Sequence, residues 1–270
     1  MSASTSRFPP ALLIDLDGTT STDSGPIPGA PESVSWLRDR GVPFRFVTNI
    51  TRMPKSSILS RLRRDGIPVA EHEVITALVV GAVTLTEMGA GLVAPFVSPE
   101  TLEDLEGFEL CGGTSQEPAR QPDAVLLGDL GRGWSVELLN EAFRYVLEGA
   151  KLVALQKNRF WMGPQGREMD AGPFVAAIEY ASGSEAVICG KPRKQFFDAA
   201  LKSMGIELNE SGDDLPAMIG DDLWGDVRGA QEAGLQGWLV RTGKFRQDDL
   251  ETSGVKPDRV LDSIADIINL

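Results

Sequence analysis

The stretch "LLIDLDGT", residues 12–19, places two carboxylates directly after an apolar run. The three apolar residues predict a buried strand, and Asp15 and Asp17 follow at an i, i+2 spacing. Side chains two residues apart on a strand point to the same side of it. Like charges held that close repel one another unless a metal ion, a shared proton or a bound ligand neutralises them. The stretch therefore predicts a strand that ends in a ligand site.

Further short apolar runs alternate with helix-like segments, which predicts a doubly wound, Rossmann-like α/β sheet of parallel strands. The middle of the chain has a different texture, with strands separated by loops rich in Gly and Pro. We interpret it as a second, smaller α/β unit inserted into the first. The predicted core is residues 1–76 and 183–270, and the predicted insertion is residues 77–182. The expected core strands lie at residues 11–18, 43–49, 185–190, 216–222 and 237–243, and an amphipathic helix is expected to close the chain at residues 263–270.

Composition and charge argue against a nucleic-acid-binding protein. The chain has 270 residues, of which 42% are hydrophobic and 24% charged, as in an ordinary globular protein. Its net charge of −13 argues against a general nucleic-acid binder. The one dense basic cluster, Arg61, Arg63 and Arg64, is interpreted as a solvated helix face.

Cysteine and histidine are too few for two common kinds of site. Cys111, Cys189 and His72 cannot by themselves supply the roughly four N or S ligands of a zinc site. A Ser-His or Cys-His nucleophile would need His72, which lies in a polar stretch and is expected at the surface.

Two distant cysteines favour a reducing compartment. With no signal-like or membrane-spanning segment apparent, we expect a cytoplasmic protein without a membrane partner.

Four of the expected strands end in polar residues suited to chemistry. Because the carboxyl ends of parallel strands share one edge of a sheet, these residues are expected to converge. The first strand ends at Asp15 and Asp17, the second at Thr48 and Asn49, the third at Lys191, and the fourth at Asp221, Asp222 and Asp226.

This set of side chains fits phosphoryl transfer. A phosphate monoester carries about two negative charges near neutral pH, so an aspartate can approach it only when cations neutralise that charge. Oxygen ligands favour Mg²⁺, which is the expected cofactor. Asp15 is expected to attack phosphorus, and Asp17 to protonate the leaving group and then activate water. Thr48 and the Asn49 amide would hold phosphate oxygens, and Lys191 would stabilise the transition state. Asp221 would complete the metal shell, and Asp226 would position Lys191 or water on the metal.

Each motif alone has a structural explanation, because Asp and Gly are common in caps and turns. The joint occurrence of four such motifs, each after an apolar strand, favours a site. Two other functions remain as alternatives to a phosphatase. One is a receiver-like domain that stores phosphate on an aspartate, and the other is a phosphate-binding protein without catalysis.

The motifs resemble those of a known family. "DLDGT", "VTN", "GKP" and "GDDLWGDV" are similar to the four motifs of the haloacid dehalogenase superfamily. The long gap between the second and third motifs resembles subclass IIA, which inserts an α/β cap there. Residues 169–192 and 217–246 are most similar to the phospholysine phosphohistidine inorganic pyrophosphate phosphatases and their haloacid dehalogenase-like hydrolase relatives.

The resemblance implies a division of roles at the site. Asp15 would be the nucleophile and a Mg²⁺ ligand, Asp17 would give its backbone carbonyl to the metal, and Asp221 would be the third protein ligand. Thr48, Asn49 and Lys191 would bind phosphate, with Gly18, Thr19, Asp222 and Asp226 in supporting positions. It also implies a homodimer formed through the cap. One departure is Thr20, because related proteins usually carry an apolar residue there.

The cap is expected to exclude water and to contact the substrate. Our candidate for the substrate-facing loop is residues 156–174, in which Lys157, Arg159 and Arg167 could meet extra negative charge. Residues 160–162 could form an apolar wall, and Asp170 could meet a cationic leaving group. The expected substrate is a small phosphorylated molecule such as pyrophosphate, phospholysine or phosphohistidine, and the alternative is a sugar phosphate or another phosphate monoester.

Overall fold

The chain divides into two compact units. The structure is a computed structural model that describes residues 8–22, 24–163, 166–208 and 215–270. The first unit comprises Met1–Thr48, Leu59–Ile75 and Lys191–Leu270, and the second comprises Asn49–Ile58 and Thr76–Gly190. The predicted insertion lies wholly within the second unit, and the exact domain boundaries stay a prediction.

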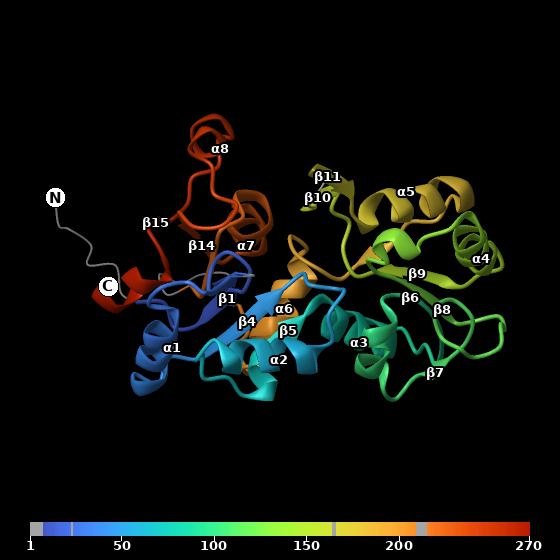
Figure 1. Cartoon of the computed structure of the whole chain (residues 1–270), viewed down its shortest axis with the longest axis horizontal. Coiled ribbons are helices and arrows are strands. Elements are labelled where there is room, and N and C mark those ends of the chain that lie inside the picture. The colour runs from blue at the N-terminus through green and yellow to red at the C-terminus, as the bar shows by residue number, and fades with distance from the viewer. Residues whose placement is uncertain (1–7, 23, 164–165, 209–214) are drawn as a thin grey trace. The chain divides into compact units, whose positions relative to one another are not determined.

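A six-stranded sheet forms the centre of the first unit (Figure 1). Its pairings from β15 to β4 are parallel, which confirms the predicted α/β class. The strands, in their order across the sheet, are β15 (Arg259–Leu261), β14 (Gln236–Val240), β13 (Ala217–Gly220), β1 (Leu12–Asp15), β4 (Phe44–Thr48) and β5 (Val74–Thr76).

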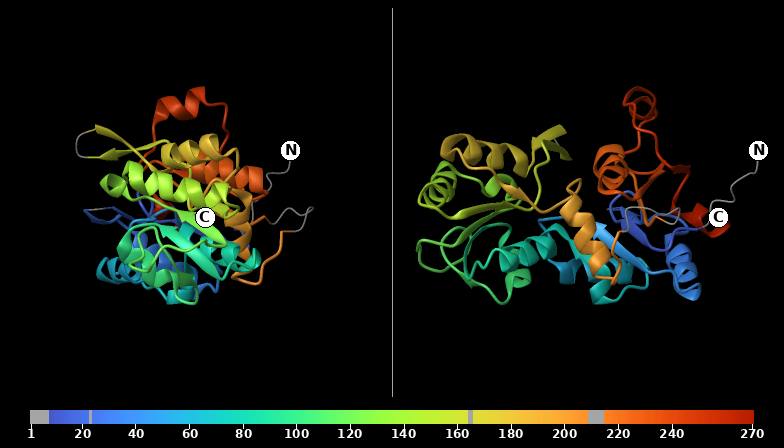
Figure 2. Two further views of the ribbon diagram at one scale, coloured as in Figure 1. Left: turned by 90° about the vertical axis from the view of Figure 1, so that its right-hand side faces the viewer. Right: turned by 180° about the vertical axis from the view of Figure 1, so that it is seen from behind.

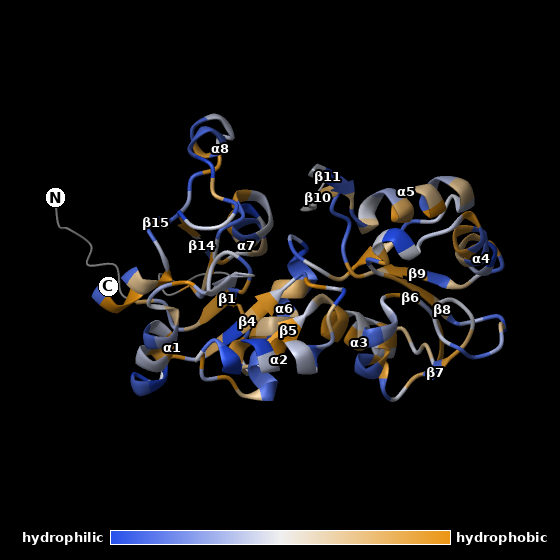
Figure 3. Cartoon of the chain, in the orientation of Figure 1, coloured by the Kyte–Doolittle hydropathy of each residue, from blue (hydrophilic) through white to orange (hydrophobic). Residues whose placement is uncertain are grey.

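Central strands of this sheet are apolar along their whole length because helices cover parallel sheets on both faces. Every residue of β1 and of β13 is buried. Figure 3 shows the strands at the middle of both sheets coloured mostly as hydrophobic. The first charged residues along β1 and β13 are therefore met only where these strands end.

Helices and one small hairpin complete the first unit. They are α1 (Ala30–Asp39), α6 (Lys194–Lys202), α7 (Gly229–Ala233), α8 (Gln247–Thr252), the 3₁₀ helices η1 (Glu71–Glu73) and η5 (Ile264–Asn269), the π-helix η4 (Leu223–Arg228), and the hairpin of β2 (Ser21–Thr22) with β3 (Gly25–Pro26). Helix α2 (Lys55–Arg64) has residues in both units.

The helix predicted to close the chain is a short 3₁₀ helix rather than an α-helix. Ile264 and Ile267 are its buried residues. A spacing of three residues places both on one face of a helix with three residues per turn. The hydroxyl of Ser263 accepts a hydrogen bond from the amide of Ala265 and so caps the start of this helix.

The second unit is built on a five-stranded parallel sheet. Its strands, in their order across the sheet, are β12 (Val187–Ile188), β9 (Lys151–Ala154), β8 (Ala124–Leu127), β6 (Leu92–Phe96) and β7 (Glu109–Leu110). Figure 2 shows α4 and α5 together on one face of this sheet and α3 on the other. The other elements are α3 (Ala77–Glu87), α4 (Val136–Leu147), α5 (Ala171–Ser182), the 3₁₀ helices η2 (Pro99–Leu105) and η3 (Gly131–Gly133), and the hairpin of β10 (Phe160–Gly163) with β11 (Gly166–Met169).

One predicted core strand belongs to the other sheet. Residues 185–190 were expected in the sheet of the first unit, but β12 pairs with β9 in the second unit, with Val187 opposite Val153. An apolar run shows that a strand is buried and does not show which sheet it joins. The chain enters the first unit directly afterwards, at Lys191.

The remaining expectations concern single residues and membrane spans. His72 is exposed, as predicted, and both cysteines are buried free thiols. Within the described part of the chain, no helix combines the length and the apolar character needed to cross a membrane.

Candidate active site

The candidate site lies at the carboxyl edge of the six-stranded sheet. Strand β1 lies between β13 and β4, where the order of the strands along the chain reverses, and ligands of open α/β sheets bind at such a point. Asp15 is the last residue of β1, Thr48 is the last residue of β4, and Asp221 follows the last residue of β13. All three residues are buried.

Lys191 joins two carboxylates of this edge although its own strand lies in the other sheet. Its Nζ donates to Asp15 Oδ1 at 2.6 Å and to Asp226 Oδ1 at 2.6 Å. Only 6% of the Lys191 side chain is exposed. A buried ammonium is tolerated when carboxylates pair with it at hydrogen-bond distance.

The electrostatics of the site favour an additional cation. Burial raises the pKa of Asp15 to about 6, against the lowering effect of Lys191. Burial also raises the pKa of Asp221 and that of Asp226, each to about 7. Burial disfavours the charged form of Lys191, but Asp15 and Asp226 outweigh this effect and raise the pKa of that ammonium. Lys191 alone therefore does not neutralise the three acids.

The acids of the site fit a divalent metal ion. One carboxylate oxygen from each of Asp15, Asp221 and Asp226 lies within 4.8 Å of the other two. Asp221 Oδ1 is buried and has no hydrogen-bond partner in the described part of the chain, whereas Oδ2 accepts the Lys244 amide at 2.7 Å. A buried carboxylate oxygen without a donor is the ligand that a hard cation such as Mg²⁺ prefers.

Asp226 is held by protein donors on both of its oxygens. Oδ1 accepts Lys191 Nζ, and Oδ2 accepts the Asp222 amide at 3.1 Å. Asp226 therefore contacts Lys191 directly, and its role in positioning Lys191 or water on the metal stays a prediction. The Asp17 carboxylate is not part of the acidic cluster, and for this residue the resemblance implied a contribution through the backbone carbonyl.

Two glycines make room for Asp221. Gly18 and Gly243 have φ of +84° and +58°, in the left-handed region that favours glycine. A Cβ at either position would overlap the Asp221 carboxylate. The Thr242 hydroxyl donates to Gly18 O at 2.5 Å, so the loop after β14 and the loop after β1 are joined at this carboxylate.

The departure at Thr20 is accommodated by the backbone. Thr20 is fully buried, and its hydroxyl donates to Leu16 O at 3.1 Å. The threonine therefore replaces an apolar residue without leaving a buried hydroxyl unpaired. Its neighbour Thr19 is also fully buried, and among the described residues its hydroxyl has no hydrogen-bond partner.

The structure corrects the interpretation of Arg61 as a solvated residue. Its NH2 group donates to Asp17 Oδ1 at 2.8 Å, and only 12% of its side chain is exposed. Arg63 and Arg64, from the same basic cluster, are exposed as predicted. Nothing in the sequence indicates this difference, because all three arginines occupy the polar part of α2.

Sequence reasoning also missed Lys244, which follows β14. Its Nζ lies 3.1 Å from Asp222 Oδ2, and its amide binds Asp221. Asp222 Oδ1 accepts the amides of Trp224 and Gly225, so this acid caps the π-helix. The available signal was the stretch "RTGK", residues 241–244, which follows the apolar strand β14 at the same edge of the sheet.

Asn49 is the first residue of the second unit. A Cβ placed on Gly190 would lie 2.5 Å from the backbone oxygen of Leu155 and 2.7 Å from Asn49 Oδ1, so glycine is the residue that fits beside this amide. The contribution of Asn49 to phosphate binding stays a prediction.

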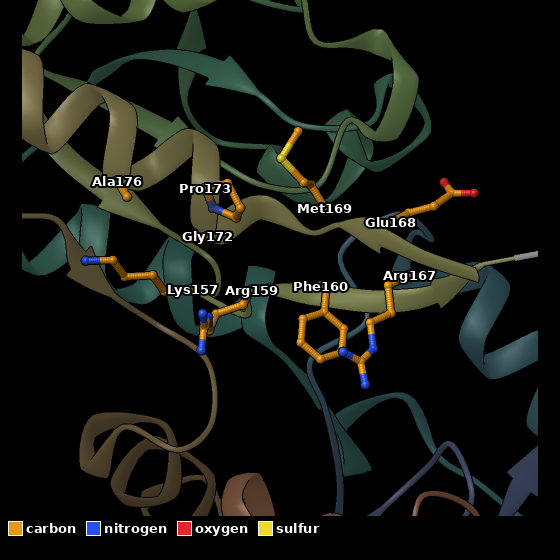
Figure 4. A pocket seen from close by; sticks show the side chains of 9 residues that line it. All are labelled: Lys157, Arg159, Phe160, Arg167, Glu168, Met169, Gly172, Pro173 and Ala176. Atoms are coloured by element: carbon orange, nitrogen blue, oxygen red, sulfur yellow. The ribbon is translucent and has the colours of Figure 1, made fainter. Parts of the chain in front are cut away.

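The second unit contains a pocket of about 550 Å³ beside the β10–β11 hairpin (Figure 4). The three cations of the predicted substrate-facing loop all line it. Figure 4 shows the Arg167 guanidinium beside the Phe160 ring, 4.9 Å from its centroid, and the Glu168 carboxylate turned away from both. The lining residues are Lys157, Arg159, Phe160, Arg167, Glu168, Met169, Gly172, Pro173 and Ala176.

Two further predicted residues of this loop have other contacts. The Trp161 ring lies 5.7 Å from the Arg52 guanidinium. Asp170 is buried, caps α5 and accepts hydrogen bonds from the Ala171 amide and Gln156 Nε2, both at 2.7 Å. These contacts give Asp170 a structural role. The side chain of Met162, and residues 164–165 altogether, lie outside the described residues.

Comparison with known proteins agrees with this architecture. A family model described as haloacid dehalogenase-like hydrolase matches residues 12–111, and one described as "HAD-hyrolase-like" matches residues 188–267. Haloacid dehalogenase-like hydrolase domain-containing protein 2 of Homo sapiens is 38% identical over 247 residues, which cover 92% of this chain and 90% of that protein. Phospholysine phosphohistidine inorganic pyrophosphate phosphatase of Homo sapiens is 33% identical over 266 residues, which cover 96% and 93%.

The fold of this chain is similar to that of solved phosphatase structures. The p-nitrophenyl phosphatase from Archaeoglobus fulgidus superposes with a TM-score of 0.86 at 26% identity, covering 97% of this chain and 98% of that one. The parallel sheets, the acids at the strand ends and these relatives define a hydrolase of the α/β class. The chain belongs to the haloacid dehalogenase-like hydrolase family.

Proposed function

We propose that the chain is a Mg²⁺-dependent phosphatase that works through an aspartyl phosphate on Asp15. The observation that carries the proposal is the buried Asp15 carboxylate, which pairs with Lys191 at 2.6 Å and clusters with the carboxylate of Asp221, one oxygen of which has no hydrogen-bond partner among the described residues. A nucleophilic carboxylate needs such neutralisation to approach a dianionic phosphate.

In the first step, an oxygen of Asp15 forms a bond to phosphorus while the bond from phosphorus to the leaving group breaks. The leaving atom keeps the electron pair of that bond and takes the proton of Asp17. In the second step, the Asp17 carboxylate takes a proton from water as the water oxygen bonds to phosphorus. The Asp15–phosphorus bond then breaks, which restores the carboxylate and releases inorganic phosphate.

The other residues hold charge and position in this scheme. Lys191 and Thr48 stabilise the oxygens of the transferring phosphoryl group, and Asp226 keeps Lys191 in place through its 2.6 Å contact. The Asp15 and Asp221 carboxylates, with the backbone carbonyl of Asp17, would hold Mg²⁺. The ion would neutralise the charge that the phosphate oxygens carry.

For the substrate, we propose a small molecule with more negative charge than one phosphoryl group, such as pyrophosphate, or a phosphoramidate. The pocket of the second unit supports the first choice because Lys157, Arg159 and Arg167 line it. The name of one relative supports both choices, since it is a phospholysine, phosphohistidine and pyrophosphate phosphatase. A phosphate monoester is the second candidate, favoured by the similarity to a p-nitrophenyl phosphatase.

We also propose a cytoplasmic location and a homodimer formed through the second unit. Val136, Leu147 and Tyr180, on α4 and α5, have exposed fractions of 68%, 61% and 94%. Large apolar side chains exposed on neighbouring helices are common where chains associate. The molar mass in solution, measured by light scattering, tests the dimer, and a monomer would contradict it.

The experiment that tests the function is phosphate release by the purified protein with Mg²⁺. The panel contains pyrophosphate, phospholysine, phosphohistidine, a sugar phosphate and p-nitrophenyl phosphate, with Asp15→Asn as the control. Selective turnover of pyrophosphate or the phosphoramidates is the expected result. Turnover limited to the monoesters would contradict the proposed substrate class and remain consistent with the proposed mechanism. Silence of the wild-type protein across the panel would contradict the proposal.

A further inference from the structure

The side chain of Arg61 is largely buried, whereas Arg63 and Arg64 of the same helix are exposed. The exposed fraction of the Arg61 side chain is 12%, whereas that of Arg64 is 76%. Its Nε is buried and has no hydrogen-bond partner in the described part of the chain. Burying a guanidinium costs free energy unless a charged partner compensates. The carboxylate of Asp17, 2.8 Å away, supplies that compensation.

The end of α2 is joined to the loop after β1 by a second, separate contact. Asp65 Oδ2 accepts the Ser21 hydroxyl at 2.6 Å, and Ser21 O accepts the Gly18 amide at 2.8 Å. Ile58 and Leu62 also anchor the helix because both are fully buried. The position of α2 therefore does not depend on Arg61 alone, and the ion pair with Asp17 remains as the distinctive contribution of this arginine.

We propose that Arg61 is a positioning residue for the acid and base of the reaction, Asp17. The half-exposed Asp17 side chain would otherwise be free to sample several rotamers, since 50% of it is in contact with solvent. The guanidinium holds Oδ1 and leaves Oδ2 to exchange the proton. This inference rests on the proposed function, in which Asp17 protonates the leaving group.

The proposal predicts an effect that depends on the leaving group. As the phosphorus–oxygen bond of an alkyl phosphate breaks, the departing alkoxide needs the proton of Asp17. The p-nitrophenolate that departs from p-nitrophenyl phosphate is stable without a proton. Loss of the positioned acid should therefore slow the hydrolysis of the alkyl phosphate and not that of p-nitrophenyl phosphate. General acid catalysis contributes about 10²–10⁴-fold to steps in which the leaving group needs a proton.

The test compares kcat/KM of Arg61→Ala for an alkyl phosphate and for p-nitrophenyl phosphate. This constant reports the step in which the leaving group departs. We expect a loss of about 10-fold or more for the alkyl ester and a loss below about 3-fold for the aryl ester. Arg61→Lys should recover part of the lost rate, because it restores a positive charge beside Asp17, and Arg61→Gln should not.

Two controls separate the ion pair from the folding of the helix. Arg63→Ala removes an exposed arginine of α2 and should leave both substrates unaffected. Asp65→Asn weakens the contact with Ser21 and should not reproduce the dependence on the leaving group. An equal loss for the two esters in Arg61→Ala, or the same dependence in Asp65→Asn, would overturn the proposal.

The proposed function itself is tested by Asp17→Asn in the same assay. If the loss of kcat/KM depends strongly on the leaving group in Asp17→Asn but not in Arg61→Ala, Asp17 is the acid and Arg61 does not position it. No dependence in Asp17→Asn would instead remove Asp17 from the role of acid.

Discussion

Lys191 in the first unit and Arg159 in the second show two different uses of a positive charge. Lys191 is 6% exposed and contacts two carboxylates at 2.6 Å. Arg159 is exposed, and among the described residues it has no ion-pair partner. A buried charge interacts strongly because little water screens it, whereas an exposed charge contributes little to stability and remains available to a ligand. Lys191 is therefore held within the acidic cluster, whereas Arg159 remains available to a ligand.

The largest effect is expected from the nucleophile. Asp15→Asn removes the carboxylate that attacks phosphorus, so turnover should fall at least about 10⁴-fold. Circular dichroism should show an unchanged fold, because Asn has nearly the same size and can still accept a hydrogen bond from Lys191. Substantial residual activity in a folded variant would remove Asp15 as the nucleophile.

Removal of the metal should have the next largest effect. With excess EDTA, the phosphate approaches Asp15 without the divalent cation that would neutralise their charges, and the rate should drop by about 10³-fold or more. Added Mg²⁺ should restore the rate. Unchanged turnover in EDTA would refute the role proposed for the acidic cluster.

A smaller effect is expected on stability, in the absence of metal. The pKa of Asp221 is raised to about 7 in the folded protein, so the fold binds this proton more tightly than the unfolded chain. This contribution to the free energy of unfolding is present below about pH 4 and is lost as the pH rises to about 7. At pH 8, the free energy of unfolding of Asp221→Asn should therefore exceed that of the wild type by about 1–3 kcal/mol. At pH 4, the two proteins should have nearly the same stability.

Urea titrations in EDTA at both pH values provide the measurement. The wild-type protein should recover stability at pH 8 when Mg²⁺ is added, and Asp221→Asn should recover less. A variant that is less stable than the wild type at pH 8 without metal would show that the Asp221 carboxylate does not carry the expected cost.

The smallest effect is expected in the pocket of the second unit. Arg159→Ala should raise KM for pyrophosphate by about 3–10-fold and leave kcat nearly unchanged, because an exposed cation contributes about 1 kcal/mol to binding. Arg144→Ala, which removes an exposed arginine of α4 outside the pocket, is the matched control. A fall in kcat without a change in KM would contradict a role in recognition alone.

Much of the fold could be predicted from local sequence. Apolar runs such as residues 12–14 indicate buried parallel strands, and their alternation with helices indicates the α/β class, which the structure confirms. The membership of strand β12 could not be predicted, because an apolar run indicates burial and is compatible with either sheet. Pairing of this kind is decided by tertiary packing.

The candidate site was predictable to a similar degree. Asp15, Asp221 and Asp226 were expected to converge, and one carboxylate oxygen from each does lie within 4.8 Å of the other two. Their catalytic roles stay predictions. The contact of Arg61 with Asp17 could not be foreseen, because helical periodicity does not say which arginine of a polar face turns inward.

The central claim is that Asp15 carries the phosphoryl group during turnover. The most direct test is to quench the Mg²⁺-loaded enzyme in acid during turnover and to analyse its peptides by mass spectrometry. The account predicts one added phosphoryl group on the peptide that contains Asp15, and none in Asp15→Asn. Catalytic turnover with an unmodified Asp15 peptide at every quench time, or with phosphate on another residue, would contradict it.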